Sequence, residues 1–260
     1  LDGKEYFDDL GRSGRQKEYF DNMRAGAAPV TSLLPTAAYI EYFEPCFKDG
    51  KDILFVAFSS QLSGTINNVY AAREELLAKY PDRRMTVVDT LSISAPQTIL
   101  ILKAHELYRQ GKSMDEVAGW LEANKLRAQA WFTVDDLKYL RRGGRIGAMA
   151  ATVGTMLDLK PIITENRAGK LVSSDKVRGR KAALRLIADK AAENIDDPAQ
   201  AMTIILHADA PEDAARLESM LRERVPALGE IQTYYVGPVI GAHCGPGTVA
   251  ICFFGKERPC

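Results

Sequence analysis

The chain has 260 residues, 46% of them hydrophobic, and its 34 Lys and Arg residues are balanced by 34 Asp and Glu residues. This length allows a sizeable core and two domains, and the zero net charge argues against a general nucleic-acid-binding surface. No apolar run approaches roughly 18 residues and no leader pattern opens the chain, so stable membrane insertion is not expected. Four cysteines without a CxxC pair favour a cytoplasmic protein and no metal site.

The first half of the chain alternates between predicted strands and helices. Its opening segment, Leu1-Asp-Gly-Lys-Glu5, is typical of a strand end and turn, which predicts that further residues precede it. Apolar runs predict strands at residues 53–58, 85–89 and 130–134. Periodicity and a capping box predict helices at residues 66–80, 97–110, from Ser113 with Glu116 onward, 137–140 and 148–157. This alternation is typical of βαβ units around a parallel sheet.

The pattern changes near Lys160. Two strand-like runs, residues 161–164 and 170–177, flank a turn at 166–169 and predict a hairpin. The segments predicted after it are helix 181–194, strand 202–207, helix 211–225, strand 231–236 and strand 248–254. We therefore predict an α/β fold in which a parallel-sheet N-terminal domain, residues 1–155, precedes a second, smaller mixed α/β domain, residues 156–260.

A hydroxyl-rich loop follows the strand predicted at residues 53–58. It leads into a helix whose first backbone N–H groups have no partner within the helix. Gly64 allows a close approach of the backbone, and the helix dipole favours negative charge. The loop supplies hydroxyl donors at Ser59, Ser60, Ser63 and Thr65. It therefore predicts a binding site for a carboxylate or phosphate.

A second hydroxyl pair lies upstream. Thr31 and Ser32 precede a helix start marked by Pro35 and Thr36, so they form either a capping turn or a pair of ligands.

One histidine has an unusual setting. His243 lies in a segment dense in Gly and Pro, residues 237–247, which we expect to be a loop that fixes the direction of the imidazole. A structural histidine is the alternative. His105, inside a predicted helix, and His207, at a strand end, are expected to be structural or exposed.

Common nucleotide and hydrolase motifs do not occur. The loop at residues 59–65 has no lysine for GxxxxGK[ST], and residues 143–147 miss GxGxxG, so we interpret these glycines as turn residues. Ser63 does not lie in a GxSxG elbow. A serine hydrolase that acts on acyl esters with Ser63, His243 and Asp209 remains an alternative, and so does a pure interaction or regulatory module.

Five motifs occur in the order seen in DegV family proteins, which the chain resembles over nearly its whole length. They are Thr31-Ser-x-x-Pro35, Ser59-Ser-Gln-Leu-Ser-Gly-Thr65, Asp135-Asp-Leu-Lys-Tyr-Leu-Arg-Arg-Gly-Gly-Arg-Ile-Gly147, Lys176-Val-Arg-Gly179 and His243-x-Gly-Pro-Gly247. The resemblance implies a bacterial two-domain protein that holds one long-chain fatty acid between its domains, uses no cofactor and is not itself an enzyme. It also implies that a separate fatty-acid kinase subunit phosphorylates the acyl carboxylate, and that the acyl phosphate enters phospholipid synthesis.

The resemblance assigns roles to particular residues. The carboxylate-binding hydroxyls correspond to Thr31 and Ser63, with Ser32 adjacent, and the motif histidine corresponds to His243, which we expect to donate a hydrogen bond to the carboxylate. Residues expected to shape the site are Gly64, Thr65, Gly245 and Gly247. Arg178 corresponds to part of the basic face offered to the kinase.

Two departures from the family pattern stand out. The family's N-terminal Thr-Asp-Ser strand is missing, and its glycine-rich stretch after an Asp-Ser pair is replaced by Asp89-Thr-Leu-Ser-Ile-Ser-Ala-Pro-Gln97. Because that stretch borders the lipid in relatives, the resemblance leaves the preferred chain length open.

Overall fold

The structure is a computed structural model that describes residues 5, 7–145 and 159–259. It divides into two compact units, each considered by itself. The six-stranded unit comprises Leu1–Thr31, Gln129–Asn166 and Leu171–Cys260, and the two-stranded unit comprises Ser32–Ala128 and Arg167–Lys170. In the described parts of the chain, no helix is long and apolar enough to cross a bilayer.

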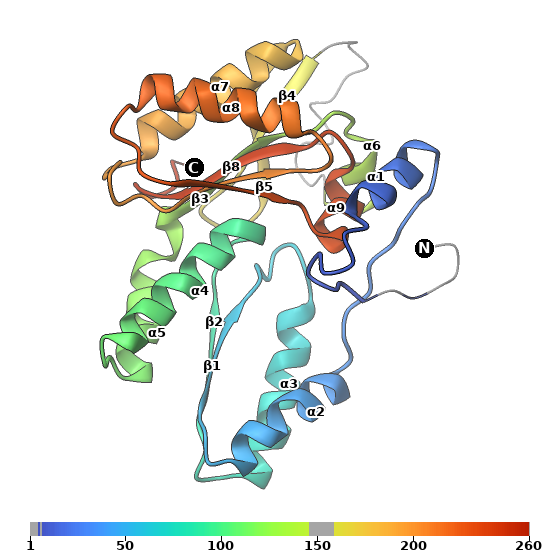
Figure 1. The fold of residues 1–260 in the computed structure, drawn as a ribbon. Coiled ribbons are helices and arrows are strands. Elements are labelled where there is room, and N and C mark those ends of the chain that lie inside the picture. Colours follow the sequence, from blue (N-terminus) through green and yellow to red (C-terminus); the bar gives the residue numbers. More distant parts are fainter. Residues whose placement is uncertain (1–4, 6, 146–158, 260) are drawn as a thin grey trace. The chain divides into compact units, whose positions relative to one another are not determined.

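The two-stranded unit is a βαβ arrangement with additional helices. Strands β1 (Ile53–Ala57) and β2 (Met85–Asp89) pair in parallel, with Ile53 opposite Met85, and α3 (Thr65–Lys79) connects them. Helices α2 (Thr36–Lys48) and α3 pack together on one side of the strands, and α4 (Ser94–Arg109) and α5 (Met114–Asn124) lie on the other (Figure 1). A short 3-10 helix, η1 (Lys125–Arg127), follows α5.

An aromatic cluster forms the core beneath α2 and α3. Its buried members are Phe43, Phe47, Val69, Leu76 and Met85. Phe43 packs edge-on against Phe55 with ring centroids 5.7 Å apart, a geometry that aromatic quadrupoles favour. The apolar residues of α2, α3 and both strands therefore meet on one side of this small sheet.

The six-stranded unit has a mixed sheet with the strand order β5-β4-β3-β8-β6-β7. Its strands are β3 (Ala128–Thr133), β4 (Leu159–Glu165), β5 (Leu171–Arg178), β6 (Thr203–His207), β7 (Ile231–Tyr235) and β8 (Val249–Phe254). The predicted hairpin is β4 with β5, which pair antiparallel with a bulge at Ile162 and Ile163. Strand β6 pairs in parallel with β7 and antiparallel with β8.

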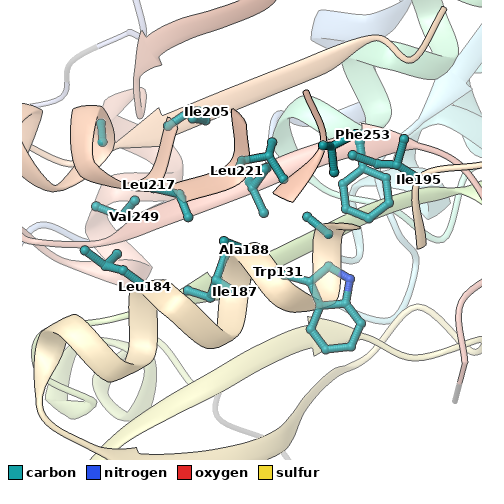
Figure 2. Close-up of a cluster of buried hydrophobic side chains, with 14 of the residues drawn as sticks. Trp131, Leu184, Ile187, Ala188, Ile195, Ile205, Leu217, Leu221, Val249 and Phe253 are labelled. Carbon is teal, nitrogen blue, oxygen red and sulfur yellow. The ribbon is translucent and has the colours of Figure 1, made fainter. Parts of the chain in front are cut away.

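Helices α7 (Arg180–Asn194) and α8 (Pro211–Arg224) cover one face of this sheet (Figure 1). Their inward side chains, including Ile187 and Leu217, join Ile205, Ile251 and Phe253 of the sheet in one buried cluster (Figure 2). Strands β3 and β6 are buried along their whole length, including the polar side chains of Gln129, Thr133, Thr203 and His207.

The fold class expected from the sequence is confirmed, with two corrections. Strand β3 was expected in the parallel sheet of the first half, but it pairs antiparallel with β4, with Trp131 opposite Thr164. The mixed sheet is also the larger of the two, not the smaller. Periodicity identifies a strand but carries no information about its partner, which explains the first error. The boundary expected at 155/156 and the helix expected at 148–157 lie outside the described residues, as does most of the strand end expected at the chain's start.

Three short helices gather at one end of the six-stranded unit (Figure 1). They are α1 (Gln16–Arg24), α6 (Lys138–Arg142) and α9 (Pro238–Cys244). Helix α1 was not predicted, because only Phe20 and Met23 of its nine residues are buried and its apolar face is narrow.

Candidate site for an acyl carboxylate

Thr31 and His243 meet within the six-stranded unit. Thr31 Oγ1 lies 2.9 Å from His243 Nε2, and both side chains are partly buried. The two residues are 212 positions apart in the chain. The hydroxyl and the imidazole that the family resemblance assigns to the carboxylate are therefore direct neighbours.

The segment around His243 is a helix and not the expected loop. Gly237 and Pro238 start α9, and Gly245 ends it with a φ of 77°. A Cβ on Gly245 would lie 2.1 Å from Cδ2 of Tyr139. Proline at a first helical position and glycine after the last one are ordinary helix boundaries, and the sequence interpretation gave both residues to a loop. His243 is therefore carried by a short helix.

The second nitrogen of the imidazole faces the backbone. His243 Nδ1 is buried and has no hydrogen-bond partner among the described residues. A Cβ on Gly143 would lie only 2.2 Å from that nitrogen, so the close approach requires glycine at position 143. Whether it carries a proton or a lone pair, this buried nitrogen lacks a partner among the described residues, which costs roughly 1 to 3 kcal/mol.

The surroundings favour a neutral ring, and the direction of its hydrogen bond with Thr31 depends on the tautomer. Burial lowers the pKa of His243, and the positive charges of Arg145 and Arg142 lower it further, which favours the neutral form. With the proton on Nε2, the ring donates to Thr31 Oγ1 and leaves Nδ1 as a lone pair. The hydroxyl hydrogen of Thr31 then remains available for another acceptor, such as a carboxylate oxygen.

Two arginines make the surroundings of His243 positive. Arg142 lies over the ring of Tyr139, 5.3 Å from its centroid, and Arg145 Nη1 donates to the carbonyl of Gly143 at 2.5 Å. The sequence interpretation treated the Arg-Arg-Gly-Gly-Arg run as a turn and missed both. The signal was the spacing of three arginines around two glycines, which places guanidinium groups next to a backbone that can approach another element closely.

Ser63 belongs to the two-stranded unit and is held by local contacts. Its Oγ lies 2.8 Å from Thr65 Oγ1 and accepts from the backbone N–H of Thr65 at 3.3 Å. Gly64 is the residue immediately before α3, so the hydroxyl pair stands at the positive end of that helix. This arrangement is suited to an anion, as the sequence predicts for residues 59–65.

The remaining hydroxyls of the loop have other environments. Ser59 is fully buried, and its Oγ donates to the carbonyl of Gly169 at 2.8 Å, which gives it a structural role. Ser60 Oγ accepts from the side-chain amide of Gln61 at 3.3 Å. Ser32, the neighbour of Thr31, is exposed.

The other predicted residues are placed as follows. Arg178 is exposed at the last position of β5, an edge strand. His207 is 5% exposed, accepts from the backbone N–H of Ala210 at 3.3 Å and packs on Tyr235, so its expected structural role fits. His105 is exposed on α4.

The hydrolase alternative requires an acidic residue on the far nitrogen of His243. That nitrogen is the buried Nδ1 without a partner among the described residues. The carboxylate of Asp209 is bound to Arg24 at 2.5 Å and accepts from the Tyr235 hydroxyl at 3.4 Å. The histidine and the aspartate of the supposed triad are therefore not joined, and no observation favours this alternative.

A family model described as uncharacterised protein, DegV family, matches residues 1–256. A DegV domain-containing protein of Clostridium perfringens is 40% identical over 258 residues, which cover 99% of this chain and 88% of the relative. The chain belongs to the DegV family. The resemblance recognised from five motifs is confirmed.

Solved DegV structures share the fold. A DegV lipid-binding protein from Thermotoga maritima is 27% identical with a TM-score of 0.85, over 99% of this chain and 88% of that one. A DegV family protein from Thermus thermophilus, described by its fatty-acid binding, is 30% identical with a TM-score of 0.81, over 92% of this chain and 84% of that one. DegV proteins similar to this chain thus bind fatty acids.

Proposed function

We propose that the protein binds a single long-chain fatty acid and holds its carboxylate with Thr31, Ser63 and His243. The observation that carries this proposal is the Thr31–His243 contact in a positive environment, which leaves the Thr31 hydroxyl hydrogen available when the imidazole proton is on Nε2. The fatty acids bound by similar DegV structures supply the ligand class. For Ser63 the support is the family motif and the hydroxyl pair at the start of α3. Ser32 is adjacent, and Gly64, Thr65, Gly245 and Gly247 shape the backbone around these groups.

Tail and head group make different contributions to binding. Burying a sixteen-carbon tail at about 0.8 kcal/mol per methylene gives on the order of 12 kcal/mol before the cost of ordering the ligand. Each hydrogen bond to a charged carboxylate adds about 1.5 to 3 kcal/mol in net terms. The tail therefore provides most of the affinity, and the hydroxyls fix the orientation of the head group.

We further propose that the bound carboxylate is presented to a separate fatty-acid kinase subunit. One carboxylate oxygen would attack the γ-phosphorus of ATP, the bond from that phosphorus to the β–γ bridging oxygen would break, and acyl phosphate and ADP would form, a reaction in which positioning dominates. A neutral His243 that fixes Thr31 serves that positioning. Arg178, exposed at the edge of the six-stranded sheet, is the residue proposed to contact the kinase.

The lipid-binding proposal is tested by native mass spectrometry of protein purified without added lipid. We expect one species whose mass exceeds that of the chain by one fatty acid, and its loss on organic extraction. Incubation with a nitrophenyl acyl ester should give no turnover. An empty protein that also fails to take up added palmitate would contradict the proposal, and ester turnover abolished in Ser63→Ala would favour a hydrolase.

A second assay tests the presentation step. Protein loaded with palmitate is mixed with a purified fatty-acid kinase subunit and ATP, and acyl phosphate is trapped with hydroxylamine. We expect product with the wild type and less with Arg178→Ala, while Lys181→Ala, which removes another exposed cation from the start of α7, serves as the matched control. Equal product from both variants would remove Arg178 from the proposed contact surface.

A further inference from the structure

Helix α1 is tied to the six-stranded sheet by an ion pair at its last residue. Arg24 Nη1 donates to Asp209 Oδ2 at 2.5 Å, and Nη2 donates to the carbonyl of the same residue at 3.0 Å. Arg24 also donates to Asp21 at 2.9 Å. Asp209 is only 11% exposed and has a φ of 53°, a conformation that Asp tolerates better than most residues. Arg24 thus donates hydrogen bonds to both the side chain and the backbone of Asp209.

The same helix packs closely on α9, which carries His243. A Cβ on Gly241 would lie 2.9 Å from the ring of Phe20, so the two helices approach as closely as a glycine allows. Tyr19 also donates from its hydroxyl to the carbonyl of Pro238 at 2.8 Å. Helix α1 is therefore held against the start and the middle of α9.

Asp209 is itself connected to the other end of α9. The neighbouring Ala208 accepts from the backbone N–H of Gly247 at 2.7 Å and donates to the carbonyl of Thr248 at 2.9 Å. Thr248 Oγ1 donates to the carbonyl of Cys244, the last residue of α9, at 2.9 Å. Asp209 is thus connected, through the hydrogen bonds of Ala208 and Thr248, to the end of the helix that carries His243.

The chain from Arg24 to Thr31 is short and partly anchored. Gly26, with a φ of 110°, turns the chain after α1, and Pro29 is buried before Thr31 reaches His243. Thr31 follows Arg24 by seven positions, so with Pro29 buried between them the last residue of α1 limits where the hydroxyl can lie.

We propose that Arg24 is a positioning residue which, through Asp209, holds the Thr31 hydroxyl against His243 and so sets the preference of the site for an ionised head group. The inference rests on the proposed binding of a fatty acid. Arg24 acts through Thr31. Its side chain is 42% exposed and that of Asp209 only 11%, so loss of this partly buried pair also lowers stability, and a change in head-group selectivity is the readout that separates positioning from folding.

The test compares palmitate with 1-hexadecanol, which has the same tail and no charge. In Arg24→Ala we expect palmitate affinity to fall about tenfold and hexadecanol affinity to fall clearly less, because a hydrogen bond from Thr31 stabilises a charged acceptor more than a neutral alcohol oxygen. Thr31→Ala should show the same selective loss. The double variant should be no weaker than Thr31→Ala alone, since both changes remove one interaction.

Arg15→Ala is the matched control, because it removes an exposed ion pair, Arg15 with Glu18, from the other end of the same helix. It should bind both lipids like the wild type. If Arg24→Ala does not fold, Asp209→Asn removes the same charge pair and is measured in its place. Equal losses for acid and alcohol, unchanged palmitate affinity, or additive losses in the double variant would each refute the positioning role while leaving fatty-acid binding intact. A wild type that binds neither lipid would overturn both.

Discussion

Ser63 contacts a residue two positions away in the chain, whereas Thr31 contacts one 212 positions away. The Ser63 hydroxyl is oriented by its own loop at the start of α3 in the two-stranded unit. The Thr31 hydroxyl depends on α1, α9 and the sheet of the six-stranded unit. Two side chains with the same proposed chemistry therefore differ in what must fold before each is in place. Changes remote in sequence should disturb Thr31 and spare Ser63.

The largest loss of stability is expected from Gly245→Ala. Gly245 follows α9, the helix whose His243 contacts Thr31. A methyl group there would overlap Tyr139, and the residue would be held at positive φ. We expect a loss of about 3 kcal/mol in the free energy of unfolding, roughly half from the backbone and half from the overlap. Gly144→Ala is the control, because φ is also positive at 70° but nothing lies near its Cβ, and it should lose only about 1 kcal/mol. Urea titrations that give equal losses would show that the contact with Tyr139 is unimportant.

The second prediction separates the two hydroxyls directly. Thr31→Ala and Ser63→Ala should each lower palmitate affinity about tenfold and hexadecanol affinity by less, since each removes one hydrogen bond that is stronger to a charged group than to a neutral one. Thr31→Ala, unlike Ser63→Ala, should shift the imidazole resonances of His243 in the lipid-free protein, because Thr31 Oγ1 lies 2.9 Å from Nε2 of that ring.

Ser60→Ala, in the same loop as Ser63, is the matched control and should behave like the wild type. A shift of the His243 signals in Ser63→Ala would contradict the separation of the two positions.

A smaller effect is expected from the capping box of α5, a local feature of the two-stranded unit. Ser113 accepts from the backbone N–H of Glu116 at 3.3 Å, and the Glu116 carboxylate accepts from the backbone N–H of Ser113 at 2.8 Å. Ser113→Ala should cost about 1 kcal/mol of unfolding free energy and leave lipid affinity unchanged. Thr98→Ala, on exposed helix surface, should cost less. Altered palmitate binding in Ser113→Ala would show that local and long-range parts of the molecule are more closely coupled than proposed.

The smallest effect is a dependence of stability on pH through His243. Burial lowers the pKa of this residue below the 6.5 of an unperturbed histidine, so the unfolded chain binds the proton more readily. Stability is then fully present above about pH 6.5 and falls as the pH drops through that value towards the lower pKa of the folded state. His243→Gln should show a shallower fall between pH 7 and 5. The slope should not vanish, because burial also lowers the pKa of His207. A slope equal to that of the wild type would mean that His243 is not buried in neutral form.

The same contrast explains what the sequence could predict. The capping box at Ser113, the hairpin around residues 166–169 and the hydroxyl pair beside Gly64 depend on neighbours within a few positions, and the sequence indicated each of them. Two other features depend on residues far along the chain. They are the pairing of β3 with β4 and the contact of Thr31 with His243. Helix α9 was mistaken for a loop because its Pro and Gly were counted as turn residues and not as boundaries. The role of Arg145 beside His243 follows from packing alone.

In the sequence, the two-stranded unit is inserted into the six-stranded one. Residues 32–128 lie between the first segment of the six-stranded unit, Leu1–Thr31, and its next segment, Gln129–Asn166. During synthesis on the ribosome, at about 5 to 20 residues per second, the inserted segment can begin to fold before β6, β8 and α9 have been made. Helix α1 packs against α9 and cannot complete its contacts until then. The contact from Ser59 to Gly169 follows only when the hairpin emerges. Thr31 gains its histidine partner only after 212 further positions have been translated. Every truncated nascent chain that ends before α9 should therefore lack this part of the binding site.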